Sequence, residues 1–238
     1  MGKIMAKIMA KSLLTRLNCV DCCALCDASG KLARVVETVR PLRVGTKMAG
    51  RAFTVRLVPG DFLTNLVAIE KAQRGDVLMI DAGYRAGVEP HWPVTGGMFG
   101  ELLAAEAQRK GLAGMVIDGN CRDTPMTRAF EIPIFSRGVH PNAGTATQLG
   151  AIGEPVQMGS VTVETGDLVL GDDDGIVVAT EAELETWLPA AEAIVATESS
   201  ILSQIQDDGR SLFEMTSNYE EHLAAVKRGE ASKLGFQP

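Results

Sequence analysis

Residues 76–123 decide the fold of this chain, and they read DVLMIDAGYRAGVEPHWPVTGGMFGELLAAEAQRKGLAGMVIDGNCRD. Two short apolar runs in this stretch, Val77–Ile80 and Gly114–Asp118, have the length and composition of buried strands. The alanine- and leucine-rich segment between residues 100 and 110 predicts a helix. A strand, a helix and a second strand in this order form a βαβ unit, so we expect the two strands to be parallel.

The sequence on either side of this unit continues the alternation of helices and strands. We expect further strands over residues 48–57, 132–135, 156–163 and 168–178. Helices are expected over residues 8–17, 19–28 and 62–73, and a long helical tail begins at 181, ends near 206 and resumes near 219. No low-complexity linker interrupts the chain. It is therefore predicted to form one α/β domain over residues 1–238, with a core at about 14–180 and a helical tail at 181–238.

The composition of the 238 residues, 46% hydrophobic and 22% charged, excludes a disordered or fibrous protein. No apolar run approaches the ~18 residues that span a bilayer, so we expect no membrane partner. Acidic residues outnumber basic ones by 30 to 23, and this net charge of −7 argues against a nucleic-acid partner. Lys3, Lys7 and Lys11 predict a basic helix face, but the start lacks the apolar block of a secretory signal, so a cytoplasmic location is expected.

Four of the five cysteines, Cys19, Cys22, Cys23 and Cys26, lie within the segment NCVDCCALCDAS. Their spacing is typical either of a metal or cluster site, or of one helix face on which cysteine is a small core residue. Four thiolates on one continuous helix cannot easily surround a tetrahedral ion, and zinc sites usually contain a chain reversal between two CxxC pairs. We therefore favour the packing interpretation.

Two unusual segments follow the strands of the βαβ unit. The residues GGMFG, 96–100, lead into the helix, and Arg122-Asp123 comes after the second strand. In such units ligands bind beyond the carboxyl ends of the strands, near the helix N-terminus. Glycines let a backbone approach a ligand, and free helical amides bind carboxylate or phosphate. A cation beside an anion can hold an anionic substrate together with a metal ion. A tight turn and a surface ion pair would explain the same residues without a function, and both interpretations stay open.

A larger part of the sequence resembles a known family. The segment GGMFGELLAAEAQRKGLAGMVIDGNCRD is followed by IPIFSRGV and later by GDLVLGDDDGIVV. Together they resemble the family that contains 4-hydroxy-4-methyl-2-oxoglutarate aldolases, related oxaloacetate decarboxylases and the regulator of ribonuclease E activity. The resemblance extends from about Leu14 to Glu198 and is strongest between Gly96 and Val178.

Three positions decide which branch of this family the chain resembles most. In the aldolases an acidic residue precedes Arg-Asp by twenty intervening residues, as Glu101 precedes Arg122 here. The ribonuclease regulators typically lack this acid and the aspartate after the arginine, whereas this chain has Glu101 and Asp123. The aldolases also carry an acid three residues after that aspartate, where this chain has Met126. The first two positions favour an enzyme, and the third leaves its substrate open.

The resemblance implies a layered αββα-type domain with a mixed central sheet or barrel and helical extensions at both ends. It implies a divalent-metal-dependent (class II) pyruvate aldolase that cleaves 4-hydroxy-2-oxo acids, such as 4-hydroxy-4-methyl-2-oxoglutarate or 4-carboxy-4-hydroxy-2-oxoadipate, and that also decarboxylates oxaloacetate. The alternatives are a non-catalytic inhibitor of ribonuclease E and a related lyase or decarboxylase for another keto acid. A homotrimer or homohexamer is implied as well.

The resemblance also assigns a metal site. Asp123 would bind the cation directly and Glu101 would hold it through water, with Mg²⁺ as the expected metal and Mn²⁺ as a substitute, since both take hard oxygen ligands. Glu198 of a neighbouring subunit would contribute through water. The run Asp172–Asp174 lacks the alternating ligands and distal glutamate of a calcium loop, so we expect a turn between strands there.

The substrate site implied by the resemblance is formed by the start of the helix and by the arginine. The carboxylate of the 2-oxo acid would rest on the amides of Leu102 and Leu103, after Gly100, and on Arg122. A Schiff-base aldolase would instead need a desolvated lysine in the pocket. No lysine lies at the carboxyl end of a predicted strand, which disfavours that mechanism.

Overall fold

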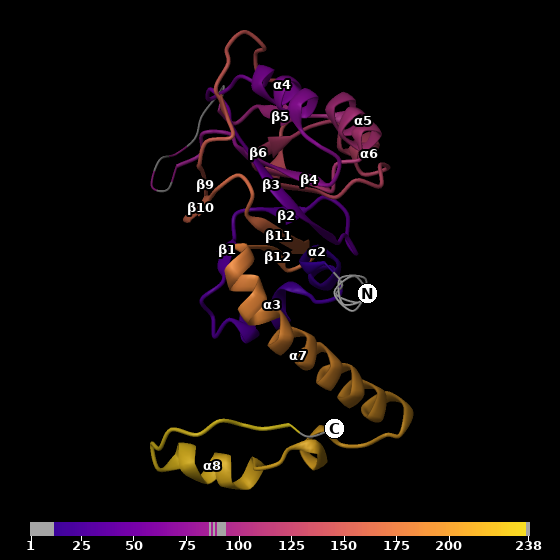
Figure 1. Cartoon of the computed structure of the whole chain (residues 1–238), viewed down its shortest axis with the longest axis vertical. Helices are drawn as coiled ribbons and strands as arrows, with labels where there is room; N and C mark the ends of the chain where they lie inside the picture. Colours follow the sequence, from indigo (N-terminus) through magenta and orange to yellow (C-terminus); the bar gives the residue numbers. More distant parts are fainter. Residues whose placement is uncertain (1–11, 86, 88, 90–93, 237–238) are drawn as a thin grey trace, which may run out of the picture. The chain divides into compact units, whose positions relative to one another are not determined.

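The computed structural model describes residues 12–85, 87, 89 and 94–236 (Figure 1). The chain divides into two compact units, residues 1–188 (unit 1) and 189–238 (unit 2). The predicted basic helix face of Lys3, Lys7 and Lys11, and the predicted helix before residue 12, lie outside the described residues. The division falls within one continuous helix, and a single domain over 1–238 stays a prediction.

The strands of the described residues all lie in unit 1. Ten belong to one mixed sheet: β1 (Arg34–Val36), β2 (Arg40–Pro41), β3 (Met48–Arg56), β4 (Asp76–Asp81), β5 (Gly97–Phe99), β6 (Gly114–Cys121), β7 (Ile134–Val139), β8 (Ala151–Ile152), β11 (Leu168–Asp172) and β12 (Gly175–Ala179). The other two form a hairpin, β9 (Val156–Met158) and β10 (Val161–Val163).

The helices of unit 1 are α2 (Leu13–Leu17), α3 (Cys22–Ala28), α4 (Leu63–Lys71), α5 (Glu101–Lys110) and α6 (Thr124–Thr127). The long helix α7 (Glu181–Asp207) begins in unit 1 and continues into unit 2. Unit 2 adds the 3₁₀ helix η1 (Leu212–Met215) and α8 (Tyr219–Lys227). In the described part of the chain, no helix is both long and apolar enough to cross a membrane.

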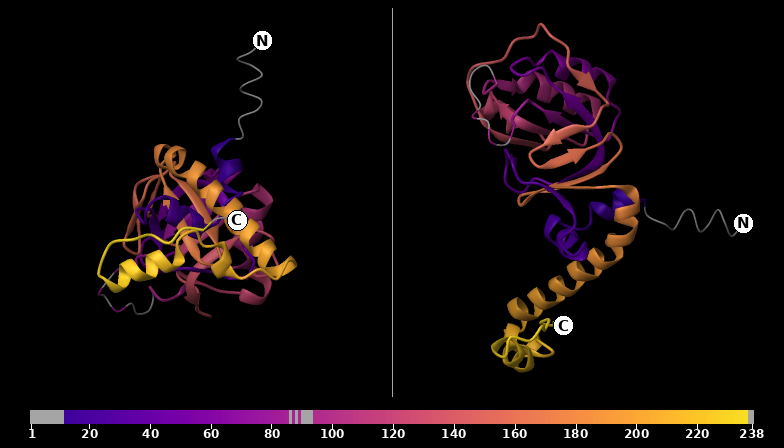
Figure 2. Two further views of the ribbon diagram at one scale, coloured as in Figure 1. Left: turned by 90° about the horizontal axis from the view of Figure 1, so that it is seen from below. Right: turned by 90° about the vertical axis from the view of Figure 1, so that its left-hand side faces the viewer.

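The sheet has the order β1-β12-β11-β3-β4-β6-β7-β2, with β5 paired to β6 and β8 paired to β3. Its centre, β3-β4-β6-β7, is parallel, and antiparallel strands extend it on both sides. The predicted βαβ unit is observed as β4-α5-β6, because β4 and β6 pair in parallel from Val77↔Gly114 to Asp81↔Asp118. The predicted α/β class, with a mixed central sheet and helices towards both ends, is confirmed. The sheet is twisted rather than flat, as Figure 2 shows.

Each face of the parallel centre packs against a different layer, because side chains alternate along a strand. On one face Leu78, Ile80 and Ile117 join a buried cluster with residues of α4 and α5, such as Ile69 and Ala104. On the other face a second buried cluster unites residues of the sheet with both strands of the hairpin: Val77, Met79, Val116, Phe135, Val156, Met158, Val161 and Val163. Helix α5, whose start was predicted to bind a ligand, therefore packs on the face of the sheet that carries Leu78, Ile80 and Ile117.

Several local predictions differ from the structure. The predicted strand 168–178 is two strands, β11 and β12, because the chain turns at Asp173 and Asp174, where the acidic run predicted a turn between strands. The predicted strand 156–163 is two strands, β9 and β10, since the chain turns at Gly159, whose φ is +60°. The predicted glycine-rich turn before α5 contains the short strand β5. The predicted helix 19–28 begins only at Cys22, because the side chain of Asp21 accepts a hydrogen bond from the amide of Ala24 and so caps α3 there.

The cysteine cluster therefore does not occupy one face of a continuous helix. Cys22 is buried, and its thiol donates to the carbonyl oxygens of Leu170 and Gly175, whereas Cys19 and Cys23 are exposed. Burial raises the pKa of Cys22 far above that of a free thiol. Among the described residues no group of three or more His, Cys, Asp or Glu side chains is arranged to hold a metal ion. The packing interpretation thus holds for Cys22 but not for the exposed pair.

A buried carboxylate joins the start of α4 to the loop that follows β7. Asp61 is fully buried, and its Oδ1 accepts from the amide of Leu63 at 2.9 Å. Its Oδ2 accepts from the hydroxyl of Thr145 and the amide of Thr147, both at 2.7 Å, and from the amide of Gln148 at 3.1 Å. Burial alone would raise the pKa of Asp61, but these hydrogen bonds outweigh burial and lower it to about 2.

The first prediction concerns this carboxylate. Because its pKa is lowered on folding, the stability it contributes is present above about pH 4 and is lost as the pH falls towards 2. Asp61→Asn should lower the free energy of unfolding at pH 7 by about 2 kcal/mol and flatten its pH dependence between pH 4 and 2. Urea unfolding at several pH values measures both effects. Asp27→Asn, at an exposed ion pair with Lys31, is the matched control. Equal losses in the two variants would contradict the prediction.

Candidate active site

The end of β6 and the start of α5 lie next to each other because β5 connects them. This strand pairs in parallel with β6, with Gly97 opposite Asn120 and Phe99 opposite Cys121. Immediately beyond the pairing, the amide of Arg122 donates to the carbonyl of Phe99 at 2.8 Å. The Arg-Asp pair is thereby held beside Phe99, two residues before the start of α5.

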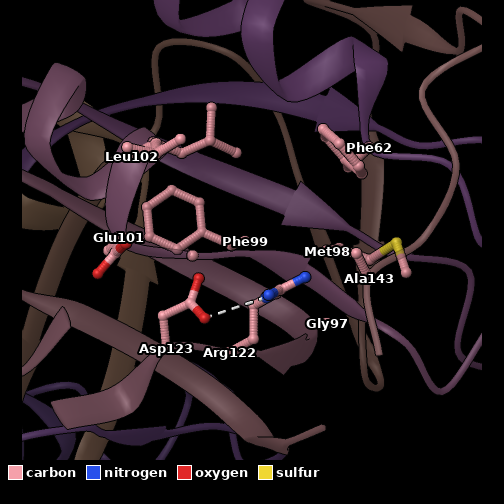
Figure 3. A pocket seen from close by; sticks show the side chains of 11 residues that line it. Phe62, Gly97, Met98, Phe99, Glu101, Leu102, Arg122, Asp123 and Ala143 are labelled. Atoms are coloured by element: carbon pink, nitrogen blue, oxygen red, sulfur yellow. Dashed lines mark hydrogen bonds and ion pairs between the residues drawn. The ribbon is translucent and has the colours of Figure 1, made fainter. Parts of the chain in front are cut away.

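A cleft of about 300 Å³ opens at this point (Figure 3). It is lined by Phe62, Gly97, Met98, Phe99, Gly100, Glu101, Leu102, Leu103, Arg122, Asp123 and Ala143. Six predicted site residues, Gly100, Glu101, Leu102, Leu103, Arg122 and Asp123, are thus brought together in one lining. The seventh, Glu198, lies on α7 within unit 2, and its part in the site stays a prediction.

Asp123 has an unusual backbone conformation, with φ 53° and ψ 39° in the left-handed region. Aspartate enters this region more readily than most residues, at a cost of about 1–2 kcal/mol. The turn of α6 helps to hold it there, because the hydroxyl of Thr127 donates to the carbonyls of Arg122 and Asp123 at 3.1 and 2.8 Å. The backbone therefore changes direction sharply after β6 while the Asp123 carboxylate remains at the cleft.

Arg122 and Asp123 form an ion pair in which both side chains remain partly exposed. Arg122 Nε lies 3.2 Å from Asp123 Oδ1, and the side chains are 35% and 32% exposed. Within the part of the chain that the structure describes, Asp123 Oδ2 accepts no hydrogen bond. The pair is open to the cleft, so it differs from a closed salt bridge with no space for a ligand.

Two of the three glycines of the segment 96–100 are required by the Arg-Asp pair itself. A Cβ atom at Gly100 would lie 2.5 Å from Asp123 Oδ2 and 3.1 Å from Arg122 Cγ. A Cβ atom at Gly97 would lie 2.9 Å from Arg122 Cβ. Real Cβ atoms essentially never lie closer than 3.0 Å to another atom, so a side chain at either position would displace part of the ion pair or, at Gly97, the carbonyl of His140, which would also lie 2.9 Å away. The physical reason for these glycines is an approach within the protein, in addition to any approach by a ligand.

The N-terminus of α5 is open to the cleft. Gly100 is its N-cap residue and, lacking a side chain, makes no capping hydrogen bond. The amides of the first helical turn, which include those of Leu102 and Leu103, have no acceptor within the helix. They carry partial positive charge, and the nearby guanidinium of Arg122 adds to it. The arrangement suits a carboxylate bound by amides and arginine together.

Five lining residues, Phe62, Gly97, Met98, Phe99 and Ala143, were not predicted as site residues. Gly97, Met98 and Phe99 lie in the glycine-rich segment, and all three are buried. Phe62 precedes α4, and Ala143 lies in the loop after β7, paired through an isolated bridge with Gly97. No local pattern could have indicated these last two, because only the tertiary fold brings their segments to the cleft.

Two buried polar residues support the lining from behind. The side-chain amide of Asn65, on α4, donates to the carbonyl of Met98 at 2.9 Å and so fixes β5. Asp61 anchors the loop that continues from Ala143. Cys121, beside Arg122, is buried, and burial raises the pKa of its thiol, so a reactive thiolate is disfavoured there.

The donor atoms at the cleft fit a hard divalent cation. Asp123 and Glu101 supply carboxylate oxygens, and Asp123 Oδ2 is free of hydrogen bonds from the described residues. Two carboxylates leave most positions of an octahedral ion to water and substrate, which is how Mg²⁺ is usually held. The described lining contains no histidine and no cysteine, the usual nitrogen and thiolate ligands of zinc.

Comparisons with known proteins show the family to which the chain is similar. The chain is 31% identical over 195 residues to a Halalkalibacterium halodurans protein named provisionally as a 4-hydroxy-4-methyl-2-oxoglutarate aldolase, covering 82% of this chain and 89% of that protein. A crystal structure of an uncharacterized Pseudomonas syringae pv. tomato protein superposes with a TM-score of 0.72 at 27% identity, over 86% of this chain and 96% of the other.

A second solved structure comes from the other branch. Streptomyces coelicolor RraAS2, described as an unusual member of the RNase ES inhibitor RraA protein family, matches with a TM-score of 0.68 at 30% identity. It covers 83% of this chain and 98% of that protein. The family profile described as "RraA-like: Aldolase/RraA" matches residues 22–178, a range that contains the whole described lining of the cleft. This chain therefore belongs to the RraA-like family, which includes both aldolases and RraA proteins.

Proposed function

We propose that this chain is a divalent-metal-dependent (class II) pyruvate aldolase. It would cleave 4-hydroxy-2-oxo acids such as 4-hydroxy-4-methyl-2-oxoglutarate or 4-carboxy-4-hydroxy-2-oxoadipate, and would also decarboxylate oxaloacetate. The observation that carries the proposal is the shared cleft of the open α5 N-terminus, Arg122 and Asp123. The name of the Halalkalibacterium halodurans relative supports the same reaction class.

The chain's own residues would bind the pyruvate part of the substrate. Its carboxylate would accept hydrogen bonds from the amides of Leu102 and Leu103, next to Gly100, where the helix dipole favours negative charge. The guanidinium of Arg122 would contact the same end of the substrate through the donors that Asp123 does not use. These contacts orient the C3–C4 bond within the cleft.

Cleavage leaves negative charge at one defined atom. As the C3–C4 bond breaks, its electron pair forms the C2=C3 double bond, the π electrons of the C2=O group move to the 2-oxo oxygen to give an enolate, and C4 becomes a carbonyl carbon. Arg122 would stabilise that oxygen, and such fixed charge stabilisation is usually the largest catalytic contribution. The C4 hydroxyl loses a proton and C3 later gains one, and we assign Glu101 to ordering the water that carries this proton.

The residues that would hold the cation are Asp123 directly, Glu101 through water and Glu198 of a neighbouring subunit through water. Mg²⁺ is the proposed metal and Mn²⁺ its substitute. The cation, when bound, would act as a Lewis acid on the 2-oxo group. No lysine is part of the described lining, so a Schiff-base aldolase lacks its nucleophile there.

A second candidate is a non-catalytic inhibitor of ribonuclease E. The likeness to RraAS2, at 30% identity, favours it. Such a protein would bind its partner without using Asp123 or a metal. A related lyase or decarboxylase for another keto acid is a third candidate, since Met126 replaces an acid of the aldolase pattern.

The proposal includes the setting in which the enzyme works. We propose a homotrimer or homohexamer, because a neighbouring subunit would supply Glu198. We propose the cytoplasm as its location. The partner would be a small 2-oxo acid, with no nucleic acid and no membrane involved. The net charge of −7 is consistent with the absence of a nucleic-acid partner.

The second prediction tests the reaction. Protein loaded with Mg²⁺ or Mn²⁺ should release pyruvate from 4-hydroxy-4-methyl-2-oxoglutarate and from oxaloacetate in an assay coupled to lactate dehydrogenase. EDTA should abolish this release, and added Mg²⁺ should restore it. Arg122→Ala and Asp123→Asn should each lower kcat/KM by about 10²–10³-fold, because each removes charge stabilisation of the enolate or of the cation.

Arg109→Ala is the matched control, since Arg109 lies near the other end of α5 in an exposed pair with Glu106. It should keep the activity of the unmodified protein. If no 2-oxo acid releases pyruvate while the protein inhibits a ribonuclease and Asp123→Asn still does so, the second candidate replaces the proposal.

The third prediction concerns Gly100→Ala. The added methyl group would displace the Asp123 carboxylate, because the Cβ would lie 2.5 Å from Oδ2. We expect kcat/KM to fall about 10²-fold, since misplacements of about 1 Å have effects of this size. The melting temperature should fall by only a few degrees, because the flexible end of Asp123 can move aside. An active alanine variant would show that the close approach does not position the carboxylate.

A further inference from the structure

The wall of the cleft is mainly apolar. Apart from two glycines and three charged residues, it consists of Phe62, Met98, Phe99, Leu102, Leu103 and Ala143. Most of these side chains are at least partly buried, but that of Leu102 is 80% exposed. In the view of Figure 3, Phe62 and Leu102 lie across the cleft from Arg122 and Asp123. A substrate whose 2-oxo acid end is held by Arg122 would therefore extend its other end along apolar side chains.

The charges of the lining also favour a substrate whose other end is uncharged. Arg122 is the cation of the described lining, and it is shared between Asp123 and the substrate's first carboxylate. Glu101 and Asp123 give the described lining one net negative charge, which the proposed divalent cation would turn into one net positive charge. The first substrate carboxylate would neutralise that charge, and Glu198 of a neighbouring subunit would add a negative one. A second substrate carboxylate would thus find no unshared cationic partner in the described lining.

Residue 126, three positions after Asp123, does not supply a polar partner for a second substrate carboxylate. Met126 lies on α6 and is 55% exposed, and it is not part of the described lining. The volume of about 300 Å³ is at the lower end for ligand pockets, which limits the distal group to a few carbon atoms or one ring.

We propose that the substrate is a 4-hydroxy-2-oxo acid with a single carboxylate and an apolar substituent at C4. This inference rests on the proposed function and ranks monocarboxylic substrates above the dicarboxylic examples named there. Cleavage of the C3–C4 bond releases pyruvate and an apolar aldehyde or ketone. The C4 hydroxyl loses its proton and C3 gains one, so the reaction needs no oxidant or reductant.

The experiment compares two substrates that differ in one group. In 4-hydroxy-4-methyl-2-oxopentanoate a methyl group replaces the distal carboxylate of 4-hydroxy-4-methyl-2-oxoglutarate. The monocarboxylate therefore yields pyruvate and acetone, whereas the dicarboxylate yields two molecules of pyruvate. With the Mg²⁺-loaded full chain, kcat/KM corrected for stoichiometry should be at least tenfold higher for the monocarboxylate. Tenfold corresponds to about 1.4 kcal/mol of transition-state free energy.

A pair of variants separates the effect of the protein from the intrinsic reactivity of the two acids. Ala143 is half-buried in a loop, and Ala143→Lys places a flexible cation at the wall, whereas Ala143→Met adds a chain of similar length without charge. The lysine variant should shift the substrate ratio towards the dicarboxylate by at least tenfold relative to the methionine variant. The ratio of two substrates on one protein is insensitive to partial loss of folding.

The outcomes distinguish this inference from the function on which it rests. A dicarboxylate that is cleaved as well as or better than the monocarboxylate, with no shift in Ala143→Lys, overturns the inference and leaves the aldolase proposal standing. The absence of pyruvate from both acids overturns the aldolase proposal and the inference together.

Discussion

The close approach of Gly100 to the Asp123 carboxylate is the constraint on which the candidate site depends. A side chain at residue 100 would occupy the space of Asp123 Oδ2, so the start of α5 and the end of β6 can meet with this carboxylate in place only over a glycine. The left-handed conformation of Asp123 and the parallel pairing of β5 with β6 belong to the same arrangement. Together they place helix amides, a guanidinium and a free carboxylate oxygen in one cleft.

Two residues that are not part of the described lining hold this arrangement in place. Asn65 fixes the carbonyl of Met98, and Asp61 anchors the loop that carries Ala143, so the walls of the cleft are set before anything binds. Both residues are fully buried, where such hydrogen bonds contribute most to a unique structure. A fixed set of dipoles and charges is what stabilisation of an enolate requires, because little reorganisation is then needed during the reaction.

Membership of the RraA-like family leaves two classes of function, because the family includes aldolases and RraA proteins. The fold therefore cannot separate them, and the separation has to come from the site. Glu101 and Asp123 give the cleft two carboxylates, which a docking surface for a ribonuclease would not need. The apolar wall then favours an enzyme for a substrate with one charged end, rather than a surface for a highly charged partner.

The sequence alone determined the βαβ unit, because the strands Val77–Ile80 and Gly114–Asp118 and the helix between them follow from local hydrophobic patterns. It also indicated that the Arg-Asp pair and the start of α5 would face each other, since parallel strands end at the same edge. It could not indicate strand β5 or the part of Phe62 and Ala143 in the lining. Those features depend on contacts between residues far apart in the chain, and only the tertiary structure decides them, because no local pattern encodes which loops meet above a sheet.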